Sequence, residues 1–176
     1  MVVEATGNAD GSLHISQAKY ICDLLHKTNM LEVNSCPTPM ISSFRLTKDG
    51  SFAINVHSLY RFVVGALQYV TITRPELAFS VNCVYQYMYT PQEHHWKTVK
   101  CILRYLTGTI SVRILHRPTK RLHPTKRLLL HGFNDSDWGN DIDDRKSTTR
   151  FCVYLGSNVV SWSSHKQKVV SRSTIS

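Results

Sequence analysis

The sequence predicts an α+β fold in which a helical region is followed by a region of β-strands. Two observations lead to this prediction. Between Ser58 and Gly108, apolar residues recur at helical spacing in three successive windows. After Gly108, short runs rich in β-branched and aromatic residues alternate with turn residues, as strands do. With 176 residues and 42% hydrophobic content, the chain is large enough to bury a core.

Composition divides the chain into four segments. Residues 1–35 predict a β-hairpin around the turn sequence GNADGS, followed by a helix that Ser16 caps. Residues 36–57 begin with a run rich in Pro, Ser and Gly, which indicates a linker loop. Residues 58–108 predict three helices, with Pro75 in the first turn of the second and Gly108 as the cap of the third. Residues 109–176 predict the strands SVRILH, RLLLHGF, STTRFCVYLG, NVVSWSS and KVVSRS.

The charge is regional. The chain has a formal net charge of +9 and a pI near 9.5, which suits a polyanionic partner such as nucleic acid. Between Gln92 and Leu128 the only acid is Glu93. Helical spacing places three cations of this region on one face, and a repeated hexapeptide adds four more. The candidate nucleic-acid-binding residues are Lys97, Lys100, Arg104, Lys120, Arg121, Lys126 and Arg127. The alternative is a solvated charged face.

Cysteine and histidine patterns indicate no metal site. The five cysteines are scattered and form no C-x-x-C pair, so neither a zinc site nor a disulfide framework is predicted. His94 and His95 have no second ligand pair nearby and are expected at the surface of a helix start. The amino terminus lacks a secretion signal, and no window reaches the ~18 apolar residues of a membrane span. We therefore expect an intracellular protein that is neither secreted nor membrane-bound, in a compartment that the sequence leaves open.

An acidic cluster interrupts the basic region in the sequence FNDSDWGNDIDDRK. Asp135 and Asp137 lie at the end of a predicted strand, and alternation places both on the same side. Asp141, Asp143 and Asp144 follow in a stretch whose composition is typical of a polar turn, where Arg145 and Lys146 partly neutralise them. The cluster is thus expected to be mainly a turn.

Several stretches, in order, resemble the Pol polyprotein of copia-type LTR retrotransposons, a family abundant in plants. They are GSLHISQAKYICDLLHKTNM, CPTPM, YRFVVGALQYVTITRPELAFSVN, HHWKTVKCILRYLTGT and FNDSDWGNDIDDRKSTTRFCVYLGSNVVSWSSHKQKVVSRS. The resemblance covers nearly the whole chain. It implies the end of a reverse transcriptase palm and the start of its thumb in residues 1–35, and a thumb- or connection-like helical region in residues 58–108. It implies a truncated RNase H domain, with an incomplete RNase H-like mixed sheet, in residues 109–176.

The resemblance also implies roles for the carboxylates. The family's first RNase H metal ligand lies in an Asp-x-Asp-Trp stretch, which here makes Asp135 a vestigial first carboxylate and a weak metal ligand, with Asp137 as the alternative. Intact family members use Mg²⁺, and two-metal chemistry needs several converging carboxylates. The family's polymerase Tyr-x-Asp-Asp pair and its later RNase H acids do not occur in this sequence. We therefore expect no polymerase or nuclease activity and no cofactor.

Two functions follow as alternatives. The first is a catalytically inactive fragment of a Pol protein that retains affinity for an RNA:DNA or DNA duplex. The second is a non-enzymatic module, derived from a retrotransposon, that binds nucleic acid or another protein. Neither involves a membrane or a small-molecule substrate, and the oligomeric state is left open.

Overall fold

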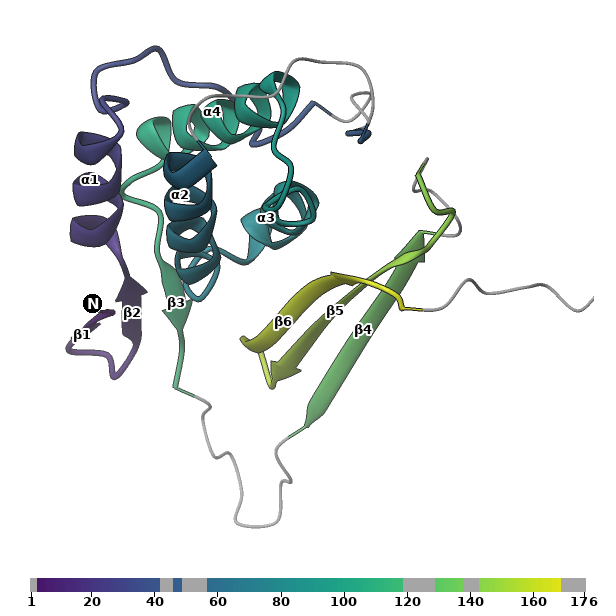
Figure 1. The fold of residues 1–176 in the computed structure, drawn as a ribbon. Helices are drawn as coiled ribbons and strands as arrows, with labels where there is room; N and C mark the ends of the chain where they lie inside the picture. The colour runs from purple at the N-terminus through teal and green to yellow at the C-terminus, as the bar shows by residue number, and fades with distance from the viewer. Residues whose placement is uncertain (1–2, 42–45, 49–56, 119–128, 138–142, 169–176) are drawn as a thin grey trace, which may run out of the picture.

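The computed structural model of the protein describes residues 3–41, 46–48, 57–118, 129–137 and 143–168. In these residues the fold is mixed α and β (Figure 1). One antiparallel sheet has the order β1-β2-β3 and contains β1 (Glu4–Gly7), β2 (Leu13–Ser16) and β3 (Ile114–His116). The other has the order β4-β5-β6 and contains β4 (Leu130–Asp137), β5 (Thr148–Leu155) and β6 (Asn158–Lys166). The α+β prediction is confirmed, whereas the RNase H-like character of the second sheet and the domain boundaries remain predictions.

The predicted amino-terminal hairpin is formed by β1 and β2. In its turn, the Asn8 N–H donates to the Ser12 carbonyl at 2.8 Å, and Gly11 adopts a φ of 78° that suits glycine. The Ser12 hydroxyl and N–H both donate to the Asp10 carboxylate, which holds the pKa of Asp10 below its ordinary value. At the other end of β2, the Ser16 hydroxyl accepts the Ala18 N–H at 3.1 Å, but Ser16 is the last residue of the strand and the N-cap of α1 is Gln17, so the predicted cap is wrong by one residue.

The predicted helices are all present. They are α1 (Ala18–Lys27), α2 (His57–Val70), the 3₁₀ helix η1 (Pro75–Leu77), α3 (Ala78–Tyr85) and α4 (Glu93–Gly108). Pro75 opens η1, where its missing N–H leaves no helical bond unmade. The helices bury their apolar faces against one another in a single core. Its fully buried members include Leu25, Val63, Leu67, Leu77, Ile102 and Leu103.

The segment after α1 runs along α4. Thr107 Oγ1 donates to the Met30 carbonyl at 2.9 Å, and Arg104 Nε donates to the Asn34 carbonyl at 2.7 Å. Gly108 is the last residue of α4 and not its predicted cap, which is Thr109. A Cβ added at Gly108 would lie 2.7 Å from the Ser35 Cβ, so glycine permits this close approach. The linker predicted in residues 36–57 stays a prediction. Its described residues 36–41 and 46–48 contain no helix or strand, but they make specific contacts with α4.

The second sheet packs against the helical part through β5 and β6. The Trp162 indole N–H on β6 donates to the Thr71 carbonyl just after α2 at 2.7 Å. The Arg150 guanidinium on β5 lies 4.5 Å from the centre of the Phe79 ring on α3. Strand β4 pairs with β5 alone in the part of the chain that the structure describes. Among the same residues, no helix is both long and apolar enough to cross a membrane.

Candidate nucleic-acid interface and carboxylate site

The basic face predicted on α4 is present as an exposed stripe. Lys97, Lys100 and Arg104 are all exposed, whereas Val99, Ile102 and Leu103 on the opposite face are buried in the core. From Lys97 to Arg104 the helix rises by about 10 Å. The sequence thus predicted which face of α4 carries the charge. We call these three residues the α4 basic stripe.

Each member of the α4 basic stripe contacts another group of the protein. Lys97 Nζ lies 2.9 Å from the Glu93 carboxylate one turn earlier, which lowers the pKa of Glu93 below its ordinary value. Lys100 Nζ lies 5.9 Å from the centre of the Trp96 ring. Arg104 donates through Nε to the Asn34 carbonyl. These contacts orient the three side chains while leaving them at the surface, where an exposed ion pair is weak.

The other four candidate cations, Lys120, Arg121, Lys126 and Arg127, lie outside the described residues. Arg117 lies shortly before these four residues in the sequence, and its structure is described. Its backbone N–H and carbonyl form hydrogen bonds with the Asn158 side chain at 2.8 Å each. This contact ties the residues that follow β3 to the β5–β6 turn. The interface that the structure describes is therefore the α4 stripe alone.

Asp135 lies near the end of β4, as predicted, and faces β5. Its carboxylate is 72% exposed, and one oxygen lies 3.9 Å from an Arg150 terminal nitrogen. Arg150 is the cross-strand partner of Asp135 in the sheet register. A guanidinium at this position competes with a divalent cation for the carboxylate. Asp137 is the last residue of β4, but its side chain lies outside the described residues.

The later acids of the cluster are engaged in structural contacts. Asp143 accepts the Lys48 N–H at 3.0 Å and the Tyr87 hydroxyl at 3.3 Å. Asp144 lies 2.8 Å from Lys166 Nζ and 3.5 Å from Lys146 Nζ. Burial alone would raise the pKa of Asp144, but the hydrogen bond from Lys166 and the charge of both lysines lower it overall.

The predicted turn is therefore confirmed for Asp143 and Asp144, while Asp141 lies outside the described residues. Lys146 contributes the expected neutralisation, and Lys166 on β6 contributes more. Among the residues that the structure describes, no three His, Cys, Asp or Glu side chains are grouped so that they could hold a metal ion.

The expectation that His95 is a surface residue is wrong. Its side chain is fully buried, and its ring stacks on Tyr87 with centroids 3.8 Å apart. Nδ1 accepts the Gln92 N–H at 3.0 Å, so Nε2 carries the proton and donates to the Thr47 carbonyl at 3.0 Å. Burial, with the neighbouring His94, lowers the pKa of His95 to about 4. His95 is a neutral residue that fixes the start of α4.

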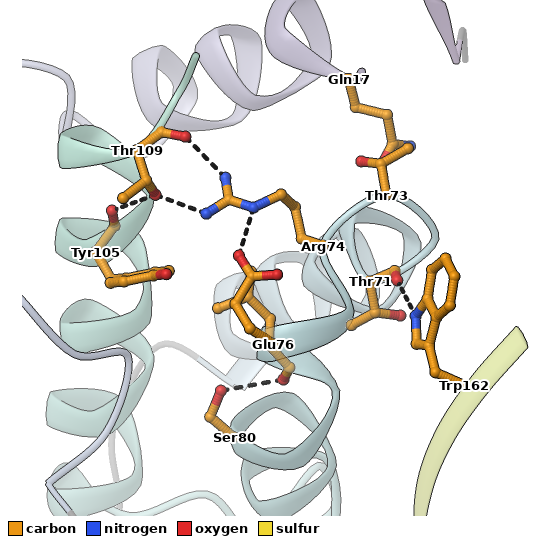
Figure 2. A network of polar contacts seen from close by, with 10 residues as sticks. Gln17, Thr71, Thr73, Arg74, Glu76, Ser80, Tyr105, Thr109 and Trp162 are labelled. Carbon is orange, nitrogen blue, oxygen red and sulfur yellow. Dashed lines mark hydrogen bonds and ion pairs between the residues drawn. The ribbon is translucent and has the colours of Figure 1, made fainter. Parts of the chain in front are cut away.

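Arg74 is a buried residue whose role the sequence analysis missed. Its Nε donates to the Glu76 carboxylate at 2.6 Å, and its two terminal nitrogens donate to the Thr109 carbonyl and hydroxyl at 2.9 and 2.7 Å (Figure 2). The cation thus lies at the carboxyl end of α4, where the helix dipole favours positive charge. The signal in the sequence was the charged pair flanking Pro75 between two apolar helices.

A polar cavity of about 150 Å³ lies where the second sheet meets the helices. Its lining includes Gln68 and Thr71 from the α2 end, Asn82 from α3, and Trp162 to Ser164 from β6. The buried Asn82 Nδ2 and Ser164 Oγ have no hydrogen-bond partner within the described part of the chain. A cavity of this size with such groups suits ordered water.

The chain is similar to two retrovirus-related Pol polyproteins of Arabidopsis thaliana, from the transposons RE2 and RE1. The identities are 44% and 43%, each over 92% of this chain and 11% of the relative. The chain thus spans about a tenth of the length of these relatives. An uncharacterized mitochondrial protein of the same plant is 38% identical over 92% of the chain and 65% of its own length.

No protein-family model and no solved structure matches the chain. The Pol relatives align over nearly all of it, including the helical region with the α4 basic stripe and most of the second sheet, given their 92% coverage. The chain therefore belongs to the family of retrovirus-related Pol polyproteins of copia-type retrotransposons.

Proposed function

We propose that this chain is a nucleic-acid-binding segment of a retrotransposon Pol protein and has no nuclease activity of its own. The observation that supports the proposal is the α4 basic stripe, in which three exposed cations line one helix face. Its length of about 10 Å corresponds to roughly three phosphates of one strand when these are counted along the duplex axis, at a rise of about 3.4 Å each. The ligand that this face would bind is the backbone of an RNA:DNA or DNA duplex.

The contacts within the stripe are compatible with phosphate binding. The Lys97 pair with Glu93 is exposed on both sides, at 70% and 52%, so a phosphate can replace the carboxylate at little cost. Arg104 uses Nε for the Asn34 carbonyl, which leaves its terminal nitrogens as the groups that would meet a phosphate. Binding of this kind positions a duplex without reading its sequence.

Salt dependence of duplex binding tests the proposal. Three phosphate contacts give a slope of about −2.7 in log K against log salt, or a loss of about 40-fold between 50 and 200 mM. The triple variant Lys97→Met/Lys100→Met/Arg104→Met should lose most of this slope. A charge-matched control, Lys19→Met/Arg61→Met/Arg113→Met, removes three exposed cations that lie outside α4 and should keep it. Equal slopes in the two variants would refute the role of the stripe.

The absence of nuclease activity is proposed from the environment of Asp135. Its exposed carboxylate faces the Arg150 guanidinium, which repels a divalent cation. Mg²⁺ sites of this kind rely on shared carboxylates and substrate phosphates. We expect no cleavage of an RNA:DNA hybrid in Mg²⁺ or Mn²⁺. Cleavage that disappears in Asp135→Asn would overturn this part of the proposal and leave duplex binding untouched.

Strand β4 favours a second candidate function, a surface for another protein chain. Leu130 and Phe133 are 66% and 64% exposed on a strand with one described neighbour, and an exposed apolar edge strand readily accepts a further strand. An antiparallel copy centred on Phe133 would place His131 opposite the other copy's Asp135, a cross-strand pair of a basic and an acidic side chain.

Sedimentation at increasing protein concentration tests this second candidate. Self-association is expected to weaken in His131→Asp, because an aspartate at position 131 of one copy then faces Asp135 of the other. It should return in His131→Asp/Asp135→Lys, because the facing residues again carry opposite charges. A chain that stays monomeric at all concentrations would exclude pairing of this kind between copies.

A further inference from the structure

Two cysteines that are 65 positions apart in the sequence lie side by side in the structure. Cys36 belongs to the segment that follows α1, and Cys101 lies on α4. Their sulfur atoms are 3.6 Å apart, and both residues are half-buried. None of the five cysteines in the part of the chain that the structure describes forms a disulfide, so this proximity singles out one pair from the set. The scattered spacing in the sequence gave no sign of it.

The backbone around the pair is held in place on both sides. The Cys36 N–H donates to the Arg104 carbonyl at 3.3 Å, one turn beyond Cys101 on α4. The Cys101 thiol donates to the Thr38 carbonyl at 3.7 Å, two residues beyond Cys36. The Asn34 carbonyl is fixed by Arg104 Nε in addition. The segment and the helix are therefore aligned in register at the two thiols.

We propose that Cys36 and Cys101 form an oxidisable dithiol site that takes a small disulfide, such as glutathione disulfide, and closes to an intramolecular disulfide. The sulfur atoms need to approach by roughly 1.5 Å to reach the ~2.05 Å of an S–S bond. Rotation about the two side-chain χ1 angles provides movement of this size. The site lies beside Lys100 and Arg104, so a closed disulfide would also fix the segment that Arg104 holds.

The reaction is two thiol–disulfide exchanges. The Cys36 thiolate attacks one sulfur of glutathione disulfide, forming a mixed disulfide and releasing one glutathione thiolate. The Cys101 thiolate then attacks the Cys36 sulfur, the protein S–S bond forms, and the second glutathione leaves. Each leaving thiolate takes up one of the two protons that the cysteines release. Two electrons pass from the protein thiols to glutathione disulfide, which is reduced to two glutathione molecules.

The environment of Cys101 indicates the order of these steps. Burial, together with the adjacent Cys36 thiol, raises the pKa of Cys101 to about 11, although the Arg104 charge opposes the rise. A thiol with this pKa is rarely a thiolate at neutral pH, so Cys101 is a poor first attacker. Once the mixed disulfide has formed on Cys36, its sulfur is held next to Cys101. Closure is then intramolecular and favoured by proximity.

Mapping of disulfides in the whole protein tests the proposal directly. The protein is incubated at neutral pH with glutathione disulfide, blocked with an alkylating reagent and digested with trypsin without reduction. We expect the peptide from Thr28 to Arg45 joined to the peptide from Cys101 to Arg104, and an intact mass about 2 Da lower than that of the reduced protein. Closing a loop of this length should raise Tm by about 5–10 °C.

Matched variants give the controls. Cys83→Ser alters another half-buried cysteine and should leave the linked peptide unchanged, whereas Cys101→Ser should stop oxidation at a mixed glutathione adduct on Cys36. The proposal is overturned if wild-type protein yields only glutathione adducts, or if the linked peptides contain Cys22, Cys83 or Cys152 instead. Mapping of the wild-type chain decides the question even if a variant fails to fold.

Discussion

Replacement of Arg74 by methionine should destabilise the protein strongly, although Arg74 lies far along the chain from both candidate sites. Methionine keeps much of the apolar stem but removes the guanidinium. Three hydrogen bonds are lost, one to Glu76 and two to Thr109, together with the contact 5.6 Å from the centre of the Tyr105 ring. Arg74 is fully buried, so water cannot take the place of these bonds without disturbing the packing.

The size of the loss in stability depends on which partners of Arg74 can form hydrogen bonds with water once the guanidinium is gone. The Glu76 side chain is 37% exposed and regains water, so its bond contributes little to the loss. The Thr109 carbonyl and hydroxyl are half-buried and lose charge-assisted bonds, each with a net contribution of about 1.5–3 kcal/mol. The free energy of unfolding should therefore fall by about 3–5 kcal/mol. This corresponds to a fall in Tm of roughly 10 °C for a chain of this size.

Equilibrium unfolding in urea, followed by tryptophan fluorescence, measures the change. Arg61→Met is the matched control, because Arg61 is exposed and its Nε donates to the Met88 carbonyl at 3.0 Å; it should cost less than about 1 kcal/mol. Glu76→Gln keeps an acceptor for Arg74 and should cost about 1 kcal/mol. If Arg74→Met lies within about 1 kcal/mol of the wild type, the buried guanidinium does not hold the end of α4 in place.

Three further predictions concern the helices and their contact with the second sheet. The pKa of His95 is lower in the folded protein, at about 4 against 6.5, so its contribution to stability is complete above pH 6.5 and is lost as the pH falls toward 4. The free energies of unfolding at pH 7 and pH 4.5 should therefore differ by about 2–4 kcal/mol; this difference should be smaller in His95→Gln and unchanged in the exposed control His26→Gln. Gly65→Ala places a methyl in open space on α2 and should stabilise by about 0.5–1 kcal/mol, whereas Gly108→Ala clashes with the neighbouring segment and should destabilise; denaturation midpoints that shift in the same direction would contradict the close approach. Trp162→Phe keeps an aromatic ring but removes the indole N–H and its hydrogen bond, and should cost about 1 kcal/mol or more and speed amide exchange in β5 and β6.

Local patterns predicted the helices well because each has a strong apolar period. Val63 and Leu67 on α2, and Val99 and Leu103 on α4, stand four positions apart, the spacing that defines a buried helix face, and all four are buried. The cations between them were correctly placed at the surface. The turn containing Asp143 and Asp144 was also predicted, since Asp favours turn geometry whatever the surrounding fold.

Contacts between distant residues were not predictable from these patterns. His95 was expected at the surface of a helix start because no second pair of metal ligands lies near it in the sequence, but Thr47 and Tyr87 enclose it from elsewhere in the chain. The Cys36 and Cys101 thiols meet only because the segment after α1 runs alongside α4 in space. The partner of a buried polar group is decided by the tertiary fold, which periodicity within one element does not encode.

The pairing of β2 with β3 has a consequence for the order of folding. Leu13 pairs with His116, about 100 positions later, so the first sheet is complete only after all the helices of the core have been made. During synthesis, the free edge of β2 in the amino-terminal hairpin therefore stays uncovered until α4 and then β3 have left the ribosome. Until then the His14 and Ile15 backbone is open to other strands, and slow synthesis between α1 and β3 should increase aggregation of the nascent chain.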